Sequence, residues 1–177
     1  MGRLPSSAEG IDTAVRNVGA CAAACALVLP AITGAPAAVP AKSSTLCAVG
    51  ETPLFSCPIG RKVASVCSRG RGAIYRFGLP GRVELTSNNL TSASEMYSGG
   101  GETQISFSNG GYTYVVFDRT QRMSIAPGRG NDTSFSNGLL IRKNGRTVSA
   151  ARCRVDSPMS PGNVERALPR GAFVYHD

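Results

Sequence analysis

The sequence predicts an all-β protein built from short antiparallel strands. The clearest sign is the stretch from Thr103 to Phe117, where two runs of β-branched and aromatic residues flank Asn109-Gly110-Gly111. Asparagine and glycine accept the positive φ angles of tight hairpin turns. A content of 21 Gly without Trp also favours many turns. The third sign is that no 3.6-residue apolar period is sustained after residue 41.

An apolar segment precedes the β-region. Residues 18–32 are apolar and contain Pro30, and the segment is shorter than the roughly 20 residues of a membrane-spanning helix. Small residues follow, of the kind found at signal-peptide cleavage sites. We therefore expect residues 1–41 to be a signal peptide with its cleavage region, cut after Ala37 or Ala41, and the mature protein to be periplasmic or secreted. An uncleaved membrane anchor is the alternative.

The net charge of +8 belongs to the expected mature part. Residues 42–177 hold 17 Lys and Arg against 9 Asp and Glu, because residues 1–41 contain two of each sign. The cations are spread along the chain and form no single run. Such a surface attracts polyanions without choosing among them.

Four cysteines remain in this part, namely Cys47, Cys57, Cys67 and Cys153. An even set in an exported chain predicts two disulfides. Of the three possible pairings we favour Cys57 with Cys67, which would close one hairpin, and Cys47 with Cys153, which would join the start of the domain to its last strand. Because the chain has no Cys-x-x-Cys motif and its single histidine is His176, we expect no metal site.

The strands are expected in sequence order, separated by turns rich in glycine and proline. Asn144-Gly145 is the strongest two-residue hairpin signal. The expected strands are 53–57, 62–68, 73–77, 83–86, the two arms of the hairpin within 103–117, 139–143 and 146–153.

Two longer connections interrupt this pattern. Residues 87–101 are polar and glycine-rich, and residues 118–136 carry three arginines. Long connections on a β-scaffold commonly carry function, so both are candidate functional segments. Residues 155–177 lack alternation and are expected to form an irregular tail, in which Phe173, Val174 and Tyr175 are able to dock on the domain.

About eight sequential antiparallel strands fit a small closed or partly open barrel spanning residues 42–154, stapled by disulfides. A two-sheet sandwich is the alternative. A barrel of this size is filled by its own side chains or holds one small ligand.

Four sequence runs carry a family likeness. In order, they are LFSCPIGRKVASVCS, YRFGLPGRVEL, GGGETQISFSNGGYTYVVFD and LLIRKNGRTVSAARC. Together, between Leu46 and Arg154, they resemble a group of small exported proteobacterial proteins of uncharacterised function. The plan of signal peptide, small disulfide-bonded β-domain and a loop from Ser92 to Gly100 is more distantly similar to periplasmic lysozyme inhibitors. That likeness implies an antiparallel barrel whose Ser-Gly-x-x-Tyr type loop blocks an enzyme cleft, although Ser94-Glu95-Met96-Tyr97 lacks the glycine after the serine.

A binding protein of the cell envelope is the first function that these observations favour. It would be an inhibitor or immunity protein that blocks a periplasmic enzyme or toxin, with Ser94, Met96, Tyr97 and Ser98 contacting the partner. Rigid loops on a stapled domain lose little entropy on docking. Because the chain is basic, an acidic partner fits better than a basic enzyme.

The alternative is a binder of anionic envelope polymers such as lipopolysaccharide. Planar guanidinium groups bind phosphate through paired hydrogen bonds. The expected anion-binding residues are Arg69, Arg71, Arg119, Arg122 and Arg129.

We expect neither an enzyme nor a cofactor-binding protein, and assign no catalytic residues. The one candidate base, His176, lies in the tail, and the carboxylates are scattered along the chain. Gly99-Gly100-Gly101 precedes a strand and lacks the lysine of a phosphate loop. Nucleic acid is not an expected partner, because Tyr112 and Tyr114 fit a strand better than a base-stacking surface.

Overall fold

The computed structural model describes residues 45–123 and 132–176. All of them belong to one compact unit, Pro40–Asp177. The expected signal peptide and Arg129 lie outside the described residues. Within these residues the chain forms nine strands and one short helix, and no helix there is long and apolar enough to cross a membrane.

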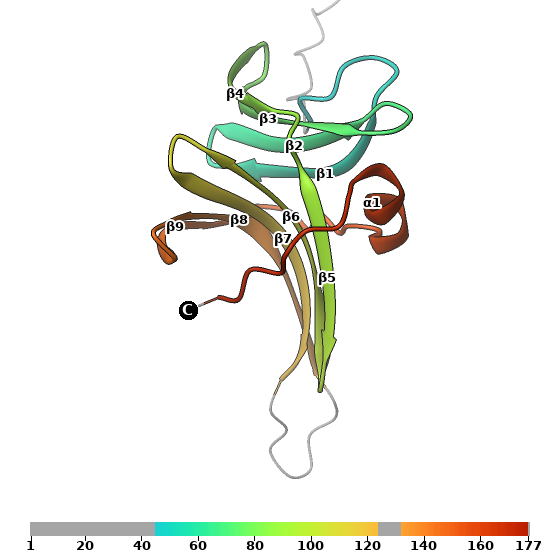
Figure 1. The fold of residues 1–177 in the computed structure, drawn as a ribbon, viewed down its shortest axis with the longest axis vertical. Helices are drawn as coiled ribbons and strands as arrows, with labels where there is room; N and C mark the ends of the chain where they lie inside the picture. The colour runs from blue at the N-terminus through green and yellow to red at the C-terminus, as the bar shows by residue number, and fades with distance from the viewer. Residues whose placement is uncertain (1–44, 124–131, 177) are drawn as a thin grey trace, which may run out of the picture. The chain divides into compact units, whose positions relative to one another are not determined.

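The first sheet is a four-stranded antiparallel meander in the order β1-β2-β3-β4 (Figure 1). Tight turns join β1 to β2 and β3 to β4, where Ile59 pairs with Lys62 and Leu79 with Arg82. The strands are Thr52–Ile59 (β1), Lys62–Ser68 (β2), Ala73–Leu79 (β3) and Arg82–Ser87 (β4).

The second sheet is a five-stranded antiparallel meander in the order β5-β6-β7-β8-β9. Asn109 pairs with Tyr112 across Gly110 and Gly111, whose φ angles are 57° and 77°. The predicted central hairpin is therefore confirmed. The strands are Thr91–Tyr97 (β5), Gly100–Asn109 (β6), Tyr112–Arg122 (β7), Thr133–Lys143 (β8) and Arg146–Arg152 (β9).

The antiparallel all-β class is confirmed, but the strands do not close into a barrel. The chain leaves the first sheet after β4 and begins a new sheet at β5, so that β4 and β5 are both edge strands. The result is a pair of sheets, as in the alternative expectation. Both sheets contribute to one core, in which Phe55, Val66 and Tyr75 of the first sheet join Ile105 and Phe107 of the second.

Alternation gives β6 two distinct faces. Ile105 and Phe107 lie on the face that shares the core with the first sheet, which we call the core face. Glu102 and Gln104 point to the opposite face. The C-terminal segment crosses this side, where Val174 packs near Val115 and Phe117; we call it the tail face.

Both segments expected to be long loops contain strand in their described residues. Residues 87–101 contain β5 and the start of β6, and residues 118–136 contain the end of β7 and the start of β8. The β5 sequence consists mainly of small polar residues, and its strand conformation depends on pairing with β6 from Thr91↔Ser106 to Tyr97↔Gly100. Such pairing is set by the tertiary fold, so the β5 sequence itself need not show the apolar alternation that predicts a strand.

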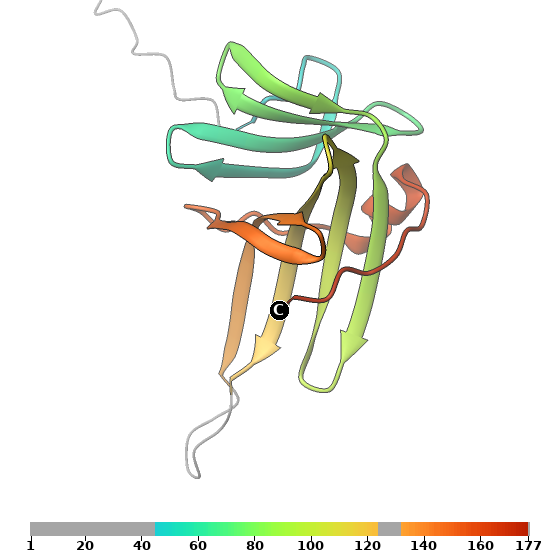
Figure 2. The same ribbon diagram turned by 60° about the vertical axis from the view of Figure 1, so that its left-hand side comes forward.

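The C-terminal segment is ordered, and the expectation of a wholly irregular tail is wrong. It contains the helix Pro161–Ala167 (α1), in which Val164 is fully buried and Leu168 follows one turn later in the same core. Proline suits the first position of a helix. Beyond α1 the chain passes across β5, as Figures 1 and 2 both show, and Val174 docks through two hydrogen bonds with the Gln104 side chain.

The four cysteines form two disulfides, Cys47–Cys67 and Cys57–Cys153, so the pairing favoured from sequence is wrong. In the β1–β2 hairpin Cys57 lies opposite Ala64, whereas Cys67 lies opposite Pro53. Cys57 and Cys67 are thus about 10 Å apart along the hairpin, too far for a disulfide. The bond from Cys57 to Cys153 instead joins the first sheet to the end of the second. Two disulfides fit an oxidising compartment.

Candidate partner-binding groove

A groove of about 850 Å³ lies on the second sheet, beyond the part of the sheet that the core covers. Strands β5 to β8 form its floor, and the segment around the start of α1 forms one wall. Three of the four residues predicted to contact a partner, Ser94, Met96 and Tyr97, line this groove. Ser98 lies beside it, exposed in the β5–β6 turn.

Two cross-strand rows run through the groove, and the second continues beyond it to Phe135. Ser94, Thr103 and Asp118 are direct partners across β5, β6 and β7, and the hydroxyl oxygens of Ser94 and Thr103 are 3.3 Å apart. Because directly paired residues share a face of the sheet, these side chains lie on the core face with Ile105. They bring two hydroxyl groups and one carboxylate into the groove, next to the apolar core.

The second row places two large apolar side chains in solvent. It runs Met96, Gly101, Thr120 and Phe135 across β5 to β8. Met96 is 86% exposed and Phe135 64% exposed. A Cβ atom on Gly101 would lie 2.4 Å from the Met96 sulfur, so the absence of a side chain at Gly101 lets the thioether lie across β6. Both side chains are thus available for contact with another molecule.

The wall contributes Met159, Pro161 and Glu165. The Met159 amide donates a hydrogen bond to Asp118 Oδ2 at 2.8 Å, which fixes this wall to β7. Burial raises the pKa of Asp118, while the Met159 hydrogen bond opposes the rise. With Asp118, Glu165 and Arg122 in its lining, the groove carries charges of both signs.

Tyr97 does not point the same way as Met96. It is the next residue along β5, so its ring lies on the tail face, near Glu102 and Arg119. Burial raises the pKa of the Tyr97 phenol, the Arg119 charge lowers it and the Glu102 charge raises it. Tyr97 therefore forms the rim of the groove, and Met96 is the more exposed of the two.

Glu102 is the centre of a polar cluster on the tail face that sequence reasoning missed. Its side chain is only 2% exposed. Arg119 Nε donates a hydrogen bond to one oxygen of the Glu102 carboxylate at 2.5 Å. Gln104 Nε2 and His176 Nε2 each lie 2.6 Å from the second oxygen of this carboxylate. Sequence spacing gave no signal for this cluster, because His176 is 74 residues from Glu102. The arrangement binds the end of the chain to the sheet.

The predicted anion-binding arginines do not gather at one place. Arg69 and Arg71 line a second groove, of about 400 Å³, together with Asn88 and Asn89. Arg122 lines the groove of about 850 Å³ on the second sheet, which we call the main groove. Arg119 is engaged by Glu102, and Arg129 lies outside the described residues.

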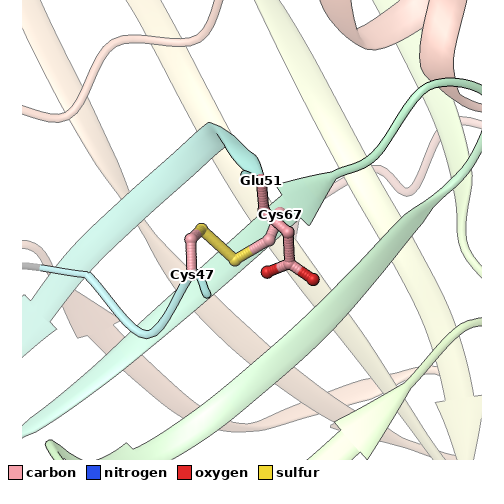
Figure 3. A group of neighbouring side chains, drawn as sticks. All are labelled: Cys47, Glu51 and Cys67. Atoms are coloured by element: carbon pink, nitrogen blue, oxygen red, sulfur yellow. A yellow bond between two sulfur atoms is a disulfide. The ribbon is translucent and has the colours of Figure 1, made fainter. Parts of the chain in front are cut away.

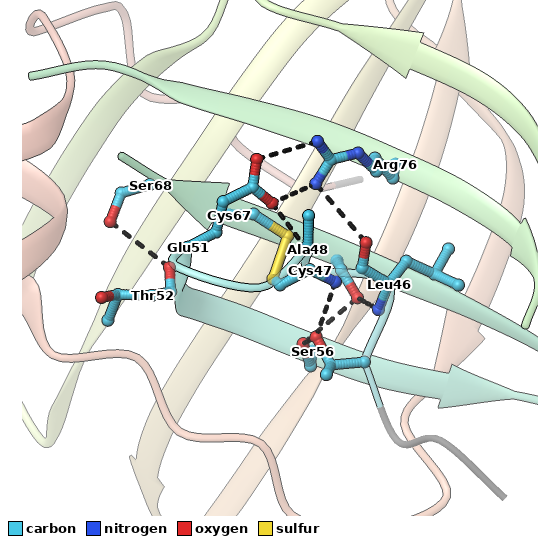
Figure 4. Close-up of a disulfide and its surroundings, with 11 residues drawn as sticks. Leu46, Cys47, Ala48, Glu51, Thr52, Ser56, Cys67, Ser68 and Arg76 are labelled. Atoms are coloured by element: carbon cyan, nitrogen blue, oxygen red, sulfur yellow. Dashed lines mark hydrogen bonds and ion pairs between the residues drawn. A yellow bond between two sulfur atoms is a disulfide. The ribbon is translucent and has the colours of Figure 1, made fainter. Parts of the chain in front are cut away.

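Cys47, Glu51 and Cys67 bring three possible metal-ligand atoms within 4.8 Å of one another (Figure 3). Both sulfurs are bonded to each other and so present no thiolate, the form that binds metals. The Glu51 carboxylate is held by Arg76 at 2.5 and 2.9 Å and accepts the Ala48 amide at 2.8 Å (Figure 4). In the oxidised protein this cluster fixes the segment before β1 to the first sheet.

Comparisons with models of protein families, with curated proteins and with solved structures found no match to this chain. The fold and the groove define a two-sheet, disulfide-stapled β-protein with a groove on its second sheet.

Proposed function

We propose that this protein is an exported binding protein that docks an envelope enzyme or toxin on the main groove and acts as its inhibitor or immunity protein. The observation that carries the proposal is the row of Met96, Gly101, Thr120 and Phe135, which holds two exposed apolar side chains beside the groove.

The energetics favour a protein partner for this row. Burial of a Met or Phe side chain stabilises a complex by about 1.5–3 kcal/mol each. A methionine is also adaptable in shape and fits irregular partner surfaces. The row is carried by paired strands, so little conformational entropy is lost on docking.

The positive net charge of the chain favours an acidic partner for this surface. The chain has a net charge of +8, and long-range attraction accelerates association with an acidic partner. The groove contains Asp118, Glu165 and Arg122, so specific polar contacts of either sign are available once the partner has docked.

The experiment is capture from an envelope extract on immobilised oxidised protein, washed first at low and then at high salt. Met96→Ser with Phe135→Ser removes the apolar pair. Val83→Ser is the matched control, because Val83 is 43% exposed but lies on β4. We expect one protein to stay bound in a fixed ratio at high salt, to be lost with the double variant and to be kept by the control. Equal retention by both variants contradicts the proposal.

Binding of an anionic polymer is the second candidate. The observation that favours it is the pair Arg69 and Arg71, which share the second groove with Asn88 and Asn89. Its test is binding of lipopolysaccharide at increasing salt, because phosphate contacts between exposed charges are screened. Binding that salt removes, that Arg69→Ala with Arg71→Ala weakens and that Met96→Ser with Phe135→Ser leaves intact supports this candidate in place of the first.

A further inference from the structure

An open pair of sheets has four edge strands, here β1, β4, β5 and β9. Edge strands present unpaired amide and carbonyl groups that recruit other strands. How each edge is covered therefore shows where the protein can accept a further strand.

The chain covers two of these edges with its own C-terminal part. Next to β1, the Arg154 amide donates to the Pro58 carbonyl at 3.0 Å and the Ser157 hydroxyl to the Ser56 carbonyl at 2.6 Å.

Along β5, the Ser92 amide donates to the Pro169 carbonyl at 2.9 Å, and the Gly171 amide donates to the Ser92 carbonyl at 2.8 Å. Residues near Arg170 thus add a short parallel bridge to β5.

Strand β9 stands at the far edge of the second sheet (Figure 1) and pairs with β8 alone among the described strands. Six of its seven residues are exposed. Thr147 pairs with Arg142 and Ser149 with Ile141, so Val148 is the extra residue of a β-bulge. A bulge and charged side chains are devices that blunt an edge strand against pairing with other strands, so a strand added to β9 must carry compensating charge.

The charge along this hairpin is of one sign. The stretch from Leu139 to Arg154 contains five cations and no acidic residue. Arg142 is occupied by the carbonyls of Gly145 and Tyr175. Arg146 and Arg152 mark the two ends of β9, and both are exposed.

We propose that β9 accepts an extended acidic segment of a partner protein as an added strand. In this mode the main-chain hydrogen bonds supply affinity and the side chains supply specificity. The bulge places Arg146 and Arg152 on opposite faces, since their partners Lys143 and Gly138 are five residues apart on β8. The added strand therefore needs a carboxylate toward each face, five residues or about 17 Å apart.

The same charges disfavour a second copy of this chain as the occupant. Two β9 strands paired with each other would bring the arginines of both copies together along one edge, and neighbouring like charges destabilise strand pairing. The surface is separate from the main groove, so this proposal does not depend on the proposed function.

The test uses the oxidised protein and a synthetic peptide, acetyl-Thr-Glu-Val-Thr-Val-Thr-Glu-Val-Thr-amide, whose two glutamates are five residues apart and therefore point to opposite faces of a strand. The measurements are the dissociation constant and amide hydrogen exchange along β9 and β4. We expect the peptide to bind and to slow exchange in β9 and not in β4. A peptide of the same sequence with alternate amides N-methylated keeps its charge but cannot form the ladder, and we expect its binding to be at least about tenfold weaker.

Two double variants distinguish the effect of the charges on β9 from the effect of the net charge of the protein. Arg146→Glu with Arg152→Glu and the control Arg61→Glu with Arg82→Glu change the net charge equally, and all four arginines are exposed. We expect only the first to weaken peptide binding, by about tenfold or more, while Met96→Ser leaves it unchanged.

Several results would overturn the proposal. They are equal binding of the N-methylated peptide, equal weakening by both double variants, absence of protection in β9, and self-association of the peptide-free protein that Arg146→Glu with Arg152→Glu alters. The last would make β9 an interface between copies of this chain.

Discussion

The buried carboxylate of Glu102 lies 2.6 Å from the imidazole Nε2 of His176. This contact, with the two hydrogen bonds between Gln104 and the Val174 backbone, holds the C-terminal segment on the tail face. The terminal segment is therefore part of the folded unit, and its attachment can be tested one residue at a time.

Replacement of His176 by Ala should loosen this segment without unfolding the domain. Glu102 keeps Arg119 and Gln104 as partners. The free energy of unfolding should therefore fall by about 1 kcal/mol, the typical contribution of one hydrogen bond. The measurement is hydrogen exchange of the Val174 amide together with urea unfolding. Ala172→Ser is the control, because Ala172 lies in the same segment and is exposed, and it should change neither. Unaltered exchange at Val174 in the His176 variant would show that the contact does not hold the tail.

Replacement of Arg119 by Met should be far more costly. It removes the cation from a carboxylate that is 2% exposed, and leaving one member of a buried ion pair alone costs about 3–5 kcal/mol. The comparison is Lys62→Met, whose partner Glu84 is 31% exposed and whose loss should cost less than about 1 kcal/mol. Urea unfolding of both variants measures the difference, and similar losses would argue against a desolvated Glu102.

The two tight hairpins could be predicted because their turn residues act locally. Asn144 and Gly145, with φ angles of 51° and 77°, make the β8–β9 turn that the Asn-Gly signal indicates. Strand β5 could not be predicted in the same way. Its sequence resembles a loop, and its conformation comes from pairing with β6 and from the cover that residues near Arg170 provide.

Only the part of the candidate site that lies within one sequence segment could be predicted. The segment containing Ser94, Met96 and Tyr97 stood out by composition, but Phe135 did not. It joins Met96 only through the register of three successive strand pairs, and register is set by the buried face as a whole. The disulfide pairing was missed on the same ground, since the β1–β2 register decides which cysteines can meet.

Acid should weaken the protein through Glu51. The Arg76 guanidinium and the Ala48 amide lower the pKa of Glu51 from 4.5 to about 2. Because the folded-state pKa is the lower one, the stabilisation is complete above about pH 4.5 and is lost as the pH falls toward 2. Unfolding free energies of the wild type and Glu51→Gln, measured between pH 7 and 2, should differ most near neutrality and converge in acid. Burial raises the pKa of Asp118. Because Asp118 is present in both proteins, its titration does not contribute to the difference between them. A difference independent of pH would contradict this role of Glu51.

The two disulfides should differ in their contribution to stability. Cys57–Cys153 closes a sequence separation of 96 residues and Cys47–Cys67 one of 20. On the chain-entropy relation the longer loop contributes about 4.7 kcal/mol and the shorter about 3 kcal/mol. Denaturant unfolding of the two paired Cys→Ser variants gives this order directly. The reverse order would mean that the Cys47–Cys67 bond, with Glu51 and Arg76 beside it, stabilises more than loop closure alone.

Substitution of Gly101 should change the groove while leaving the fold stable. A Cβ at Gly101 meets the Met96 sulfur, the end of a flexible side chain, at 2.4 Å, whereas a Cβ at Gly138 meets the Ala151 backbone oxygen at 2.2 Å. The thioether can swing away, but the β8–β9 ladder cannot. Gly101→Ala should therefore cost less than about 1 kcal/mol, and Gly138→Ala at least about 2 kcal/mol through backbone displacement. Thermal unfolding measures both costs. If the groove binds a partner as proposed, Gly101→Ala should also weaken capture, because it displaces Met96 from its place across β6; a variant that is stable and captures normally would show that the position of Met96 does not matter for binding.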